Sequence, residues 1–129
     1  MKKITITLIA VLAIMAVYAE NQTISSSSVS VRPSFAYQLF PTKNRFIFIR
    51  LDTRNGLMMQ VDVLDESQTA VLNSTRLVRR LDELNGRFSL YPTENMFIFI
   101  LLDKTNGRMW RVEWGMEDEN RSITPIPLN

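Results

Sequence analysis

Cysteine and histidine are both absent from this chain of 129 residues. Because there is no cysteine, no disulfide can stabilise the fold, and stability must come from packing or from association with another chain. The same two absences exclude Cys/His zinc sites, Ser-His-Asp and Cys-His nucleophiles, and histidine general bases. General acid–base catalysis most often recruits histidine, so we expect a protein that is not an enzyme and has no catalytic, metal-binding or cofactor-binding residues.

An excess of charge of either sign is also missing. The chain has 15 basic and 13 acidic residues, and two of the basic ones, Lys2 and Lys3, belong to a segment that we expect to be removed. Nucleic-acid binding depends on many contacts between basic side chains and phosphates. The balanced charge therefore gives no reason to expect a nucleic-acid partner.

The hydrophobic run at the start of the chain is too short for a membrane anchor. Residues 4–17 follow two lysines and fall short of the roughly 20 apolar residues that span a bilayer. The run ends in small residues, Ala16 and Ala19, in the pattern that signal peptidases cut. We predict a signal peptide at 1–19, no membrane span after its removal, and export to the periplasm or out of the cell.

The exported chain is expected to be a single domain. Residues 20–34 include four consecutive serines at 25–28 and are typical of a flexible polar leader. The remaining residues, 35–129, are of a length that suits one β domain with one modest core.

A stretch of the sequence is repeated. Residues 38–61 return as residues 89–112, at a constant offset of 51. Both copies open on Pro-Thr-x-Asn, at Pro41 and Pro92, continue through a Phe/Ile segment and reach Asp-x-x-Asn-Gly. Residues shared by the copies are expected to be scaffold, and residues that differ are where a specific role could lie.

Each copy has the pattern of three β-strands, and a fourth is expected where the similarity continues. The predicted strands are 35–40, 45–51, 57–63 and 69–73 in repeat one (37–74), and 87–91, 96–102, 108–114 and 122–128 in repeat two (88–127). Pro125 and Pro127 confine the last strand to a sheet edge. We therefore predict an all-β fold of two tandem β-meander repeats, each of three to four strands, that form one pseudo-twofold barrel or sandwich.

One short helix is expected between the copies, at about 75–85. Leu77, Leu81 and Leu84 fall on one helical face, and Asn85-Gly86 is a typical stop signal.

The shared Asp-x-x-Asn-Gly segment suits a hairpin loop. Asp52 and Asp103 can accept hydrogen bonds from backbone amides, and Gly56 and Gly107 supply the positive φ that precedes the return strand. Calcium binding is the other role for these acids, but they lack the dense alternation of carboxylates found in EF-hand loops. Turn capping is therefore the favoured role.

The middle strand of each copy has no polar face. Its phenylalanines point one way and its isoleucines the other, as the alternation Phe46, Ile47, Phe48 and Ile49 illustrates. Both faces should be covered, by the second copy, by a helix or by another chain. A homodimer is one way to provide this cover.

The hairpin at 100–110, with its turn at Asp103, Asn106 and Gly107, resembles the strand–turn–strand element of β-propeller blades. Two such units cannot close a propeller, so this resemblance implies shared hairpin geometry. The whole chain resembles the small exported, repeat-containing β proteins of gut Bacteroidetes. Neither resemblance implies an activity or assigns functional residues.

Comparison of the two copies selects six candidate partner- or ligand-binding residues, which are Arg45, Arg50, Arg54, Arg108, Trp110 and Trp114. Arginine binds carboxylates in a bidentate manner and is enriched in interfaces, although drift on a solvated face gives the same pattern. The tryptophans alternate with charged residues, which favours core packing, whereas exposure beside a groove would make them a stacking platform.

Two functions remain open at this point. The first is an exported, non-enzymatic binding or interaction protein that acts on a protein partner, in the format of an inhibitor or immunity-type factor. The alternative is a carbohydrate- or lipid-binding module whose ligand enters between the duplicated sheets. A sizeable pocket would favour the module, and a packed centre with an exposed apolar patch would favour the protein-binding function.

Overall fold

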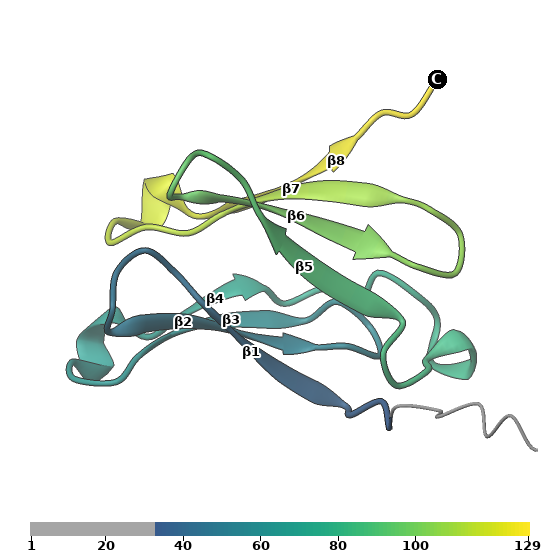
Figure 1. Cartoon of the computed structure of the whole chain (residues 1–129), viewed down its shortest axis with the longest axis horizontal. Helices are drawn as coiled ribbons and strands as arrows, with labels where there is room; N and C mark the ends of the chain where they lie inside the picture. Colours follow the sequence, from purple (N-terminus) through teal and green to yellow (C-terminus); the bar gives the residue numbers. More distant parts are fainter. Residues whose placement is uncertain (1–32) are drawn as a thin grey trace, which may run out of the picture. The chain divides into compact units, whose positions relative to one another are not determined.

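The computed structural model describes residues 33–129, one unit of the chain. The predicted signal peptide at 1–19 and all but the last two residues of the predicted leader at 20–34 lie outside the described residues. The unit consists of two four-stranded antiparallel sheets, which Figure 1 shows as two layers. The strands are β1 (Tyr37–Pro41), β2 (Ile47–Asp52), β3 (Met58–Asp62) and β4 (Ala70–Asn73) in the first sheet, and β5 (Phe88–Pro92), β6 (Ile98–Asp103), β7 (Met109–Glu113) and β8 (Ser122–Ile126) in the second.

The predicted fold class is confirmed. All eight expected strands are present, and each lies within two residues of its predicted bounds. Each repeat forms its own meander, with strand order β1-β2-β3-β4 or β5-β6-β7-β8, and the sheets do not close into a barrel. β8 contains Pro125 and forms a sheet edge, where the missing N–H of proline is tolerated.

The turns after β2 and β6 form as predicted. Asp52 and Asp103 each accept a hydrogen bond on Oδ1 from the backbone N–H two residues later, at 3.0 Å in both cases. Gly56 has a φ of +81° and Gly107 a φ of +80°. Glycine adopts this left-handed conformation without the steric cost that a Cβ atom brings.

The predicted helix at 75–85 is wrong, because that segment contains only a short 3-10 turn, Arg80–Asp82. The segment is bound instead to the turn after β2. The backbone N–H of Leu77 donates to the carbonyl of Asn55 at 2.9 Å, and the N–H of Gly86 donates to the Thr53 hydroxyl at 2.9 Å. These tertiary bonds tie the start of the segment and the residue after it to a distant turn, and the leucine spacing does not produce a helix between them. Within residues 33–129, no helix is long and apolar enough to cross a membrane.

The two sheets share one hydrophobic core, to which the repeats contribute different faces. In the second sheet Leu90 lies opposite Leu101, and Leu101 opposite Trp110, so these buried side chains share a face. We call it the front face, and its buried members are Phe88, Leu90, Phe99, Leu101, Trp110 and Val112. In the first sheet the buried side chains come from the opposite face, which we call the back face: Ile47, Ile49, Leu51, Met58 and Gln60.

The repeats therefore stack front to back. The front-face positions of the first repeat, 51 residues earlier, lie on the outside of the first sheet and carry Tyr37, Leu39, Phe48, Arg50, Met59 and Val61. The back-face positions of the second repeat lie on the outside of the second sheet and carry Ile98, Ile100, Leu102, Met109 and Arg111. In Figure 1, β1 and β5 run in the same direction. A twofold axis would bring the same face of both repeats into the core, so the expected pseudo-twofold relation does not hold.

One buried polar side chain joins the two layers. Gln60 in β3 has no exposed surface, and its Nε2 donates to the carbonyl of Gly115, just after β7, at 3.0 Å. Its Oε1 accepts a hydrogen bond from the N–H of Gly115 at 3.2 Å. Because unpaired buried polar groups are costly, this reciprocal pair favours one alignment of the sheets.

Candidate functional site

An aromatic ring and two arginines meet on the outer front face of the first sheet. Tyr37 in β1 is 56% exposed. The Cζ atom of Arg50, from β2, is 5.7 Å from the centroid of its ring, and that of Arg54, from the following turn, is 5.4 Å away. Guanidinium groups at such distances are attracted by the face of the ring. We call these three residues the Tyr37 cluster.

Strand register explains why the cluster forms. Tyr37 lies opposite Asp52, the last residue of β2, and Arg50 lies opposite Met59 in β3. Arg50 is therefore diagonal to Tyr37 on the same face, within reach of a long side chain. Its Nη2 donates to Sδ of Met59 at 3.1 Å.

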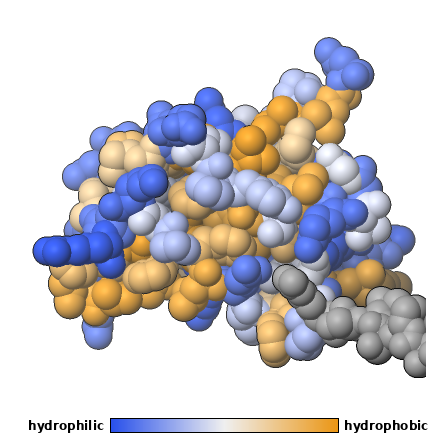
Figure 2. All heavy atoms as spheres, viewed as in Figure 1, coloured by the Kyte–Doolittle hydropathy of each residue, from blue (hydrophilic) through white to orange (hydrophobic). Residues whose placement is uncertain are grey.

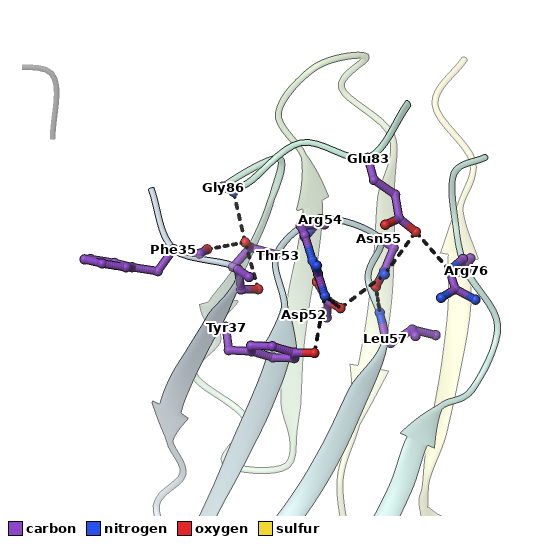
Figure 3. Close-up of polar contacts among 11 residues, drawn as sticks. Phe35, Tyr37, Asp52, Thr53, Arg54, Asn55, Leu57, Arg76, Glu83 and Gly86 are labelled. Carbon is purple, nitrogen blue, oxygen red and sulfur yellow. Dashed lines mark hydrogen bonds and ion pairs between the residues drawn. The ribbon is translucent and has the colours of Figure 1, made fainter. Parts of the chain in front are cut away.

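Arg54 is held by a bidentate ion pair with Asp52. Its Nε and Nη2 atoms donate to the two carboxylate oxygens at 2.9 and 2.8 Å, and Nη2 also donates to the Tyr37 hydroxyl at 3.3 Å, as Figure 3 shows. Burial of Asp52 raises its pKa, but the hydrogen bonds and the charge of Arg54 outweigh burial, so the pKa lies below its ordinary value. The carboxylate is therefore charged at neutral pH, and it neutralises the positive charge of Arg54 from within the same chain.

A polar network behind the cluster connects this turn to the segment that leads into the second repeat (Figure 3). The side-chain amide of Asn55 donates to Asp52 and to Glu83, both at 3.2 Å, and Arg76 donates to the same oxygen of Glu83 at 2.9 Å. The hydrogen bond from Asn55 and the contact with Arg76 lower the pKa of Glu83, although burial opposes the shift. The network holds the turn that carries Arg54.

A shallow pocket of about 250 Å³ lies on this face, and its lining includes Tyr37, Arg50, Met59 and Val71. Leu39, beside the cluster in β1, is more than half exposed, as is Val71. Figure 2 shows hydrophobic side chains along the lower margin of the molecule, where the first sheet lies. The face therefore combines an aromatic ring, arginine and aliphatic surface, which is the composition typical of protein interfaces.

The structure brings together two of the four predicted arginines, Arg50 and Arg54. Arg45 lies over the ring of Phe46, with 4.7 Å between its Cζ atom and the ring centroid. Arg108 lies over the ring of Trp110 at 5.0 Å. Neither residue lines the pocket beside Tyr37.

Both predicted tryptophans belong to the core. Trp110 is 3% exposed and Trp114 is 2% exposed, and the indole N–H of Trp114 donates to the carbonyl of Met96 at 2.9 Å. A hollow of about 410 Å³ lies beside Trp114 and is also lined by Phe97, but the tryptophan presents almost no surface to it. Neither ring is available as a stacking platform for a sugar.

The equivalent aspartate in the second repeat takes its arginine from another position. Asp103 is fully buried and accepts two hydrogen bonds from Arg87, both at 2.9 Å. The position of Arg87 is occupied by Ala36 in the first repeat, while the position of Arg54 is occupied by Thr105 in the second. Each turn thus has one arginine for its aspartate, and this explains the difference between the copies at position 54.

Sequence comparison missed Tyr37 and Leu39, which complete this face. Their counterparts Phe88 and Leu90 are buried in the second sheet, so the same residue types serve as core in one repeat and as surface in the other. Tyr37 carries a hydroxyl group that its counterpart Phe88 lacks. This difference is the sequence signal that position 37 is exposed.

Comparisons of the chain with protein-family models, with curated proteins and with solved structures find no match. Residues 33–129 also contain no group of three or more side chains able to hold a metal ion. Function has to be inferred from the surface that the fold presents.

Proposed function

We propose that the chain is an exported, non-enzymatic binding protein that holds a protein partner on the outer front face of its first sheet. The composition of that face carries the proposal: Tyr37 and Leu39 are exposed beside the guanidinium of Arg50. Exposed apolar patches mark interaction sites, and Tyr and Arg are the residue types most often responsible for binding energy. Among binding proteins, an inhibitor or an immunity-type factor is the kind that such a small scaffold without histidine suits.

Arg50 supplies the charged part of the surface. No carboxylate within residues 33–129 forms an ion pair with it, and its guanidinium lies on Tyr37 and Met59. A carboxylate of the partner can therefore bind it in a bidentate manner.

The packed centre of the molecule favours a protein partner over a small ligand held between the sheets. Core side chains of both layers, such as Leu51 and Leu101, have no exposed surface. A carbohydrate or lipid site at this place would need a cavity between the layers, but the shared core packs there. Hollows of about 300 and 210 Å³ are lined by residues from both repeats, most of which are exposed, so they lie outside that core.

Capture from the cell envelope and the culture medium tests the proposal, with residues 20–129 as bait. We expect one protein to be retained by the wild-type chain and by Leu81→Asp, and clearly less of it to be retained by Leu39→Asp, which loses the front-face site. Leu81→Asp is the matched control, because Leu81 is 93% exposed and lies in the 3-10 turn, outside the sheets. Retention on a glycan array without any protein partner would contradict the proposal and support the alternative.

A further inference from the structure

We infer that the partner on the outer front face is a second copy of this chain, which binds through the outer back face of its second sheet. The inference rests on the proposed protein-binding role of the outer front face and names its occupant. The chain already contains one interface of this kind, because the back face of the first repeat packs against the front face of the second. Among residues 33–129, nothing covers the same two kinds of face on the two outer sides of the unit.

The outer front face keeps the apolar character of its buried counterpart. Three residue pairs at the offset of 51 are identical, namely Leu39/Leu90, Phe48/Phe99 and Val61/Val112. Two further pairs exchange one large side chain for another, namely Tyr37/Phe88 and Met59/Trp110. The members from the second repeat are at most 3% exposed, whereas Tyr37 and Leu39 are more than half exposed. The outer side of an antiparallel sheet usually carries polar residues, so this face has the composition of a surface that is covered.

The outer back face matches its buried counterpart even more closely. Four residue pairs are identical, namely Ile98/Ile47, Ile100/Ile49, Leu102/Leu51 and Met109/Met58. In the first repeat all four side chains are at most 1% exposed. Tyr91, which lies opposite Ile100, is 45% exposed and occupies the position of Phe40, which packs against the core. A second copy can therefore meet this face with the contacts that the chain makes internally.

Two positions on the outer faces carry charge in place of a buried residue. Arg50 replaces Leu101, and Arg111 replaces Gln60. Arg50 lies on aromatic and thioether groups, and Arg111 is 3.5 Å from the carboxylate of Glu113. Arginine is enriched in interfaces because its planar group stacks and is weakly hydrated. The outer contact is thus more polar than the internal one, as expected for faces that meet water before assembly.

The contact between copies has a direction, because the outer front face of one copy meets the outer back face of the next and the two faces differ. Each copy uses its front face for one neighbour and its back face for another, so the interface is heterologous. Repetition of such an interface gives a closed ring when the rotation between copies closes, and an open filament when it does not. Closed arrangements of radially packed four-stranded sheets contain about four to eight sheets, so a ring would hold two to four copies of this two-sheet chain.

The oligomeric state tests the inference. Residues 20–129 contain the whole compact unit and are analysed by size-exclusion chromatography with light scattering over a wide range of concentrations. We expect the wild-type mass to rise to a multiple of the monomer mass. Leu39→Asp on the front face and Tyr91→Asp on the back face should each remain monomeric, while Leu81→Asp should associate like the wild type. Circular dichroism establishes that each variant is folded.

Mixing the two monomeric variants gives the sharpest test. Leu39→Asp keeps an intact back face and Tyr91→Asp keeps an intact front face, so an equimolar mixture should form a complex of two copies and no larger species. Association of Tyr91→Asp alone would mean that front faces bind each other, and it would overturn the inference. A wild-type monomer at high concentration would also overturn it. In that case capture of a different protein by the wild type, lost with Leu39→Asp, would leave the proposed function standing, and its absence would remove both.

Discussion

Arg87 and Asp103 form the most buried ion pair among residues 33–129, with 8% and 0% of their side chains exposed. Arg87→Ala would leave the carboxylate of Asp103 buried without its cation. Breaking a buried pair in this way typically costs about 3–5 kcal/mol. We expect a loss of that size in the free energy of unfolding, measured by urea denaturation at neutral pH.

The first repeat offers a matched control for this experiment. Arg54→Ala removes the arginine from the equivalent turn, but its side chain is 35% exposed, and Asp52 keeps the hydrogen bond from Asn55. Water can also solvate this carboxylate once the arginine is gone. The loss should be clearly smaller than for Arg87→Ala, and equal losses would show that burial does not govern these pairs.

Alanine substitutions at Gly56 and Gly107 separate the cost of backbone strain from the cost of steric crowding. Both have positive φ, so alanine at either position should cost about 1–2 kcal/mol for the left-handed conformation. A Cβ atom at Gly56 would lie 2.6 Å from Cδ1 of Leu77, whereas at Gly107 it would meet nothing within 4 Å. We therefore expect Gly56→Ala to lower the unfolding free energy more than Gly107→Ala. The same loss for both would mean that the Leu77 side chain moves away without cost.

The network between the turn after β2 and the following segment couples stability to pH. The pKa values of Asp52 and Glu83 are lower in the folded chain than their ordinary values, which are about 3.9 for Asp and 4.3 for Glu. Groups with a lowered pKa add stability above the unfolded value and lose it as the pH falls through the folded value. The unfolding free energy should therefore decrease from about pH 4 downwards.

Arg54→Ala should weaken this acid dependence, because the pKa of Asp52 then moves back towards its ordinary value. Urea titrations of both proteins at neutral and acid pH measure the difference. An acid dependence that is the same in wild type and variant would exclude Asp52 as one of its sources.

The contact between β3 and the end of β7 depends on Gln60. Gln60→Leu would keep most of the side-chain volume but leave the N–H of Gly115 without a partner, while the carbonyl of Gly115 keeps its hydrogen bond from Arg121. An unsatisfied buried group costs about 1–3 kcal/mol, and we expect a loss of that size in urea denaturation. Gln38→Leu, at an exposed position in β1, is the control and should change stability little.

The shared core should make the two repeats unfold together. Both tryptophans lie in the second repeat, so their fluorescence reports on the second sheet, while far-UV circular dichroism reports on both. We expect coincident denaturation curves from the two probes. Met58→Ala, in the core face of the first sheet, should shift both curves by about 2–5 kcal/mol. Separate transitions would contradict the shared core.

Front-to-back stacking decides what the molecule presents to its surroundings. A twofold arrangement would have buried one kind of face and left two like faces outside, which would favour an isologous dimer. The observed arrangement leaves one face of each kind, with Tyr37 on one outer side and Tyr91 on the other. The position of the surface and the direction of any assembly follow from this single feature.

Most of the local structure could be predicted from the sequence. The repeat offset, the period-2 alternation and the Asp-x-x-Asn-Gly turns are local signals, so the eight strands, both meanders and the capping roles of Asp52 and Asp103 were predicted correctly. Arg50 and Arg54 were also selected, because they differ between the copies. In all these cases the deciding interactions are between residues close in sequence or in adjacent strands.

The choice between faces could not be predicted, because the middle strands are apolar on both sides and alternation is equally satisfied by either. Only contacts between the repeats decide that Ile49 is buried while its counterpart Ile100 is partly exposed. The failed helix has the same cause, since bonds from Leu77 and Gly86 to a distant turn outweigh a local leucine pattern. Local alternation specifies the strands, and long-range packing determines which of their surfaces remain free to bind.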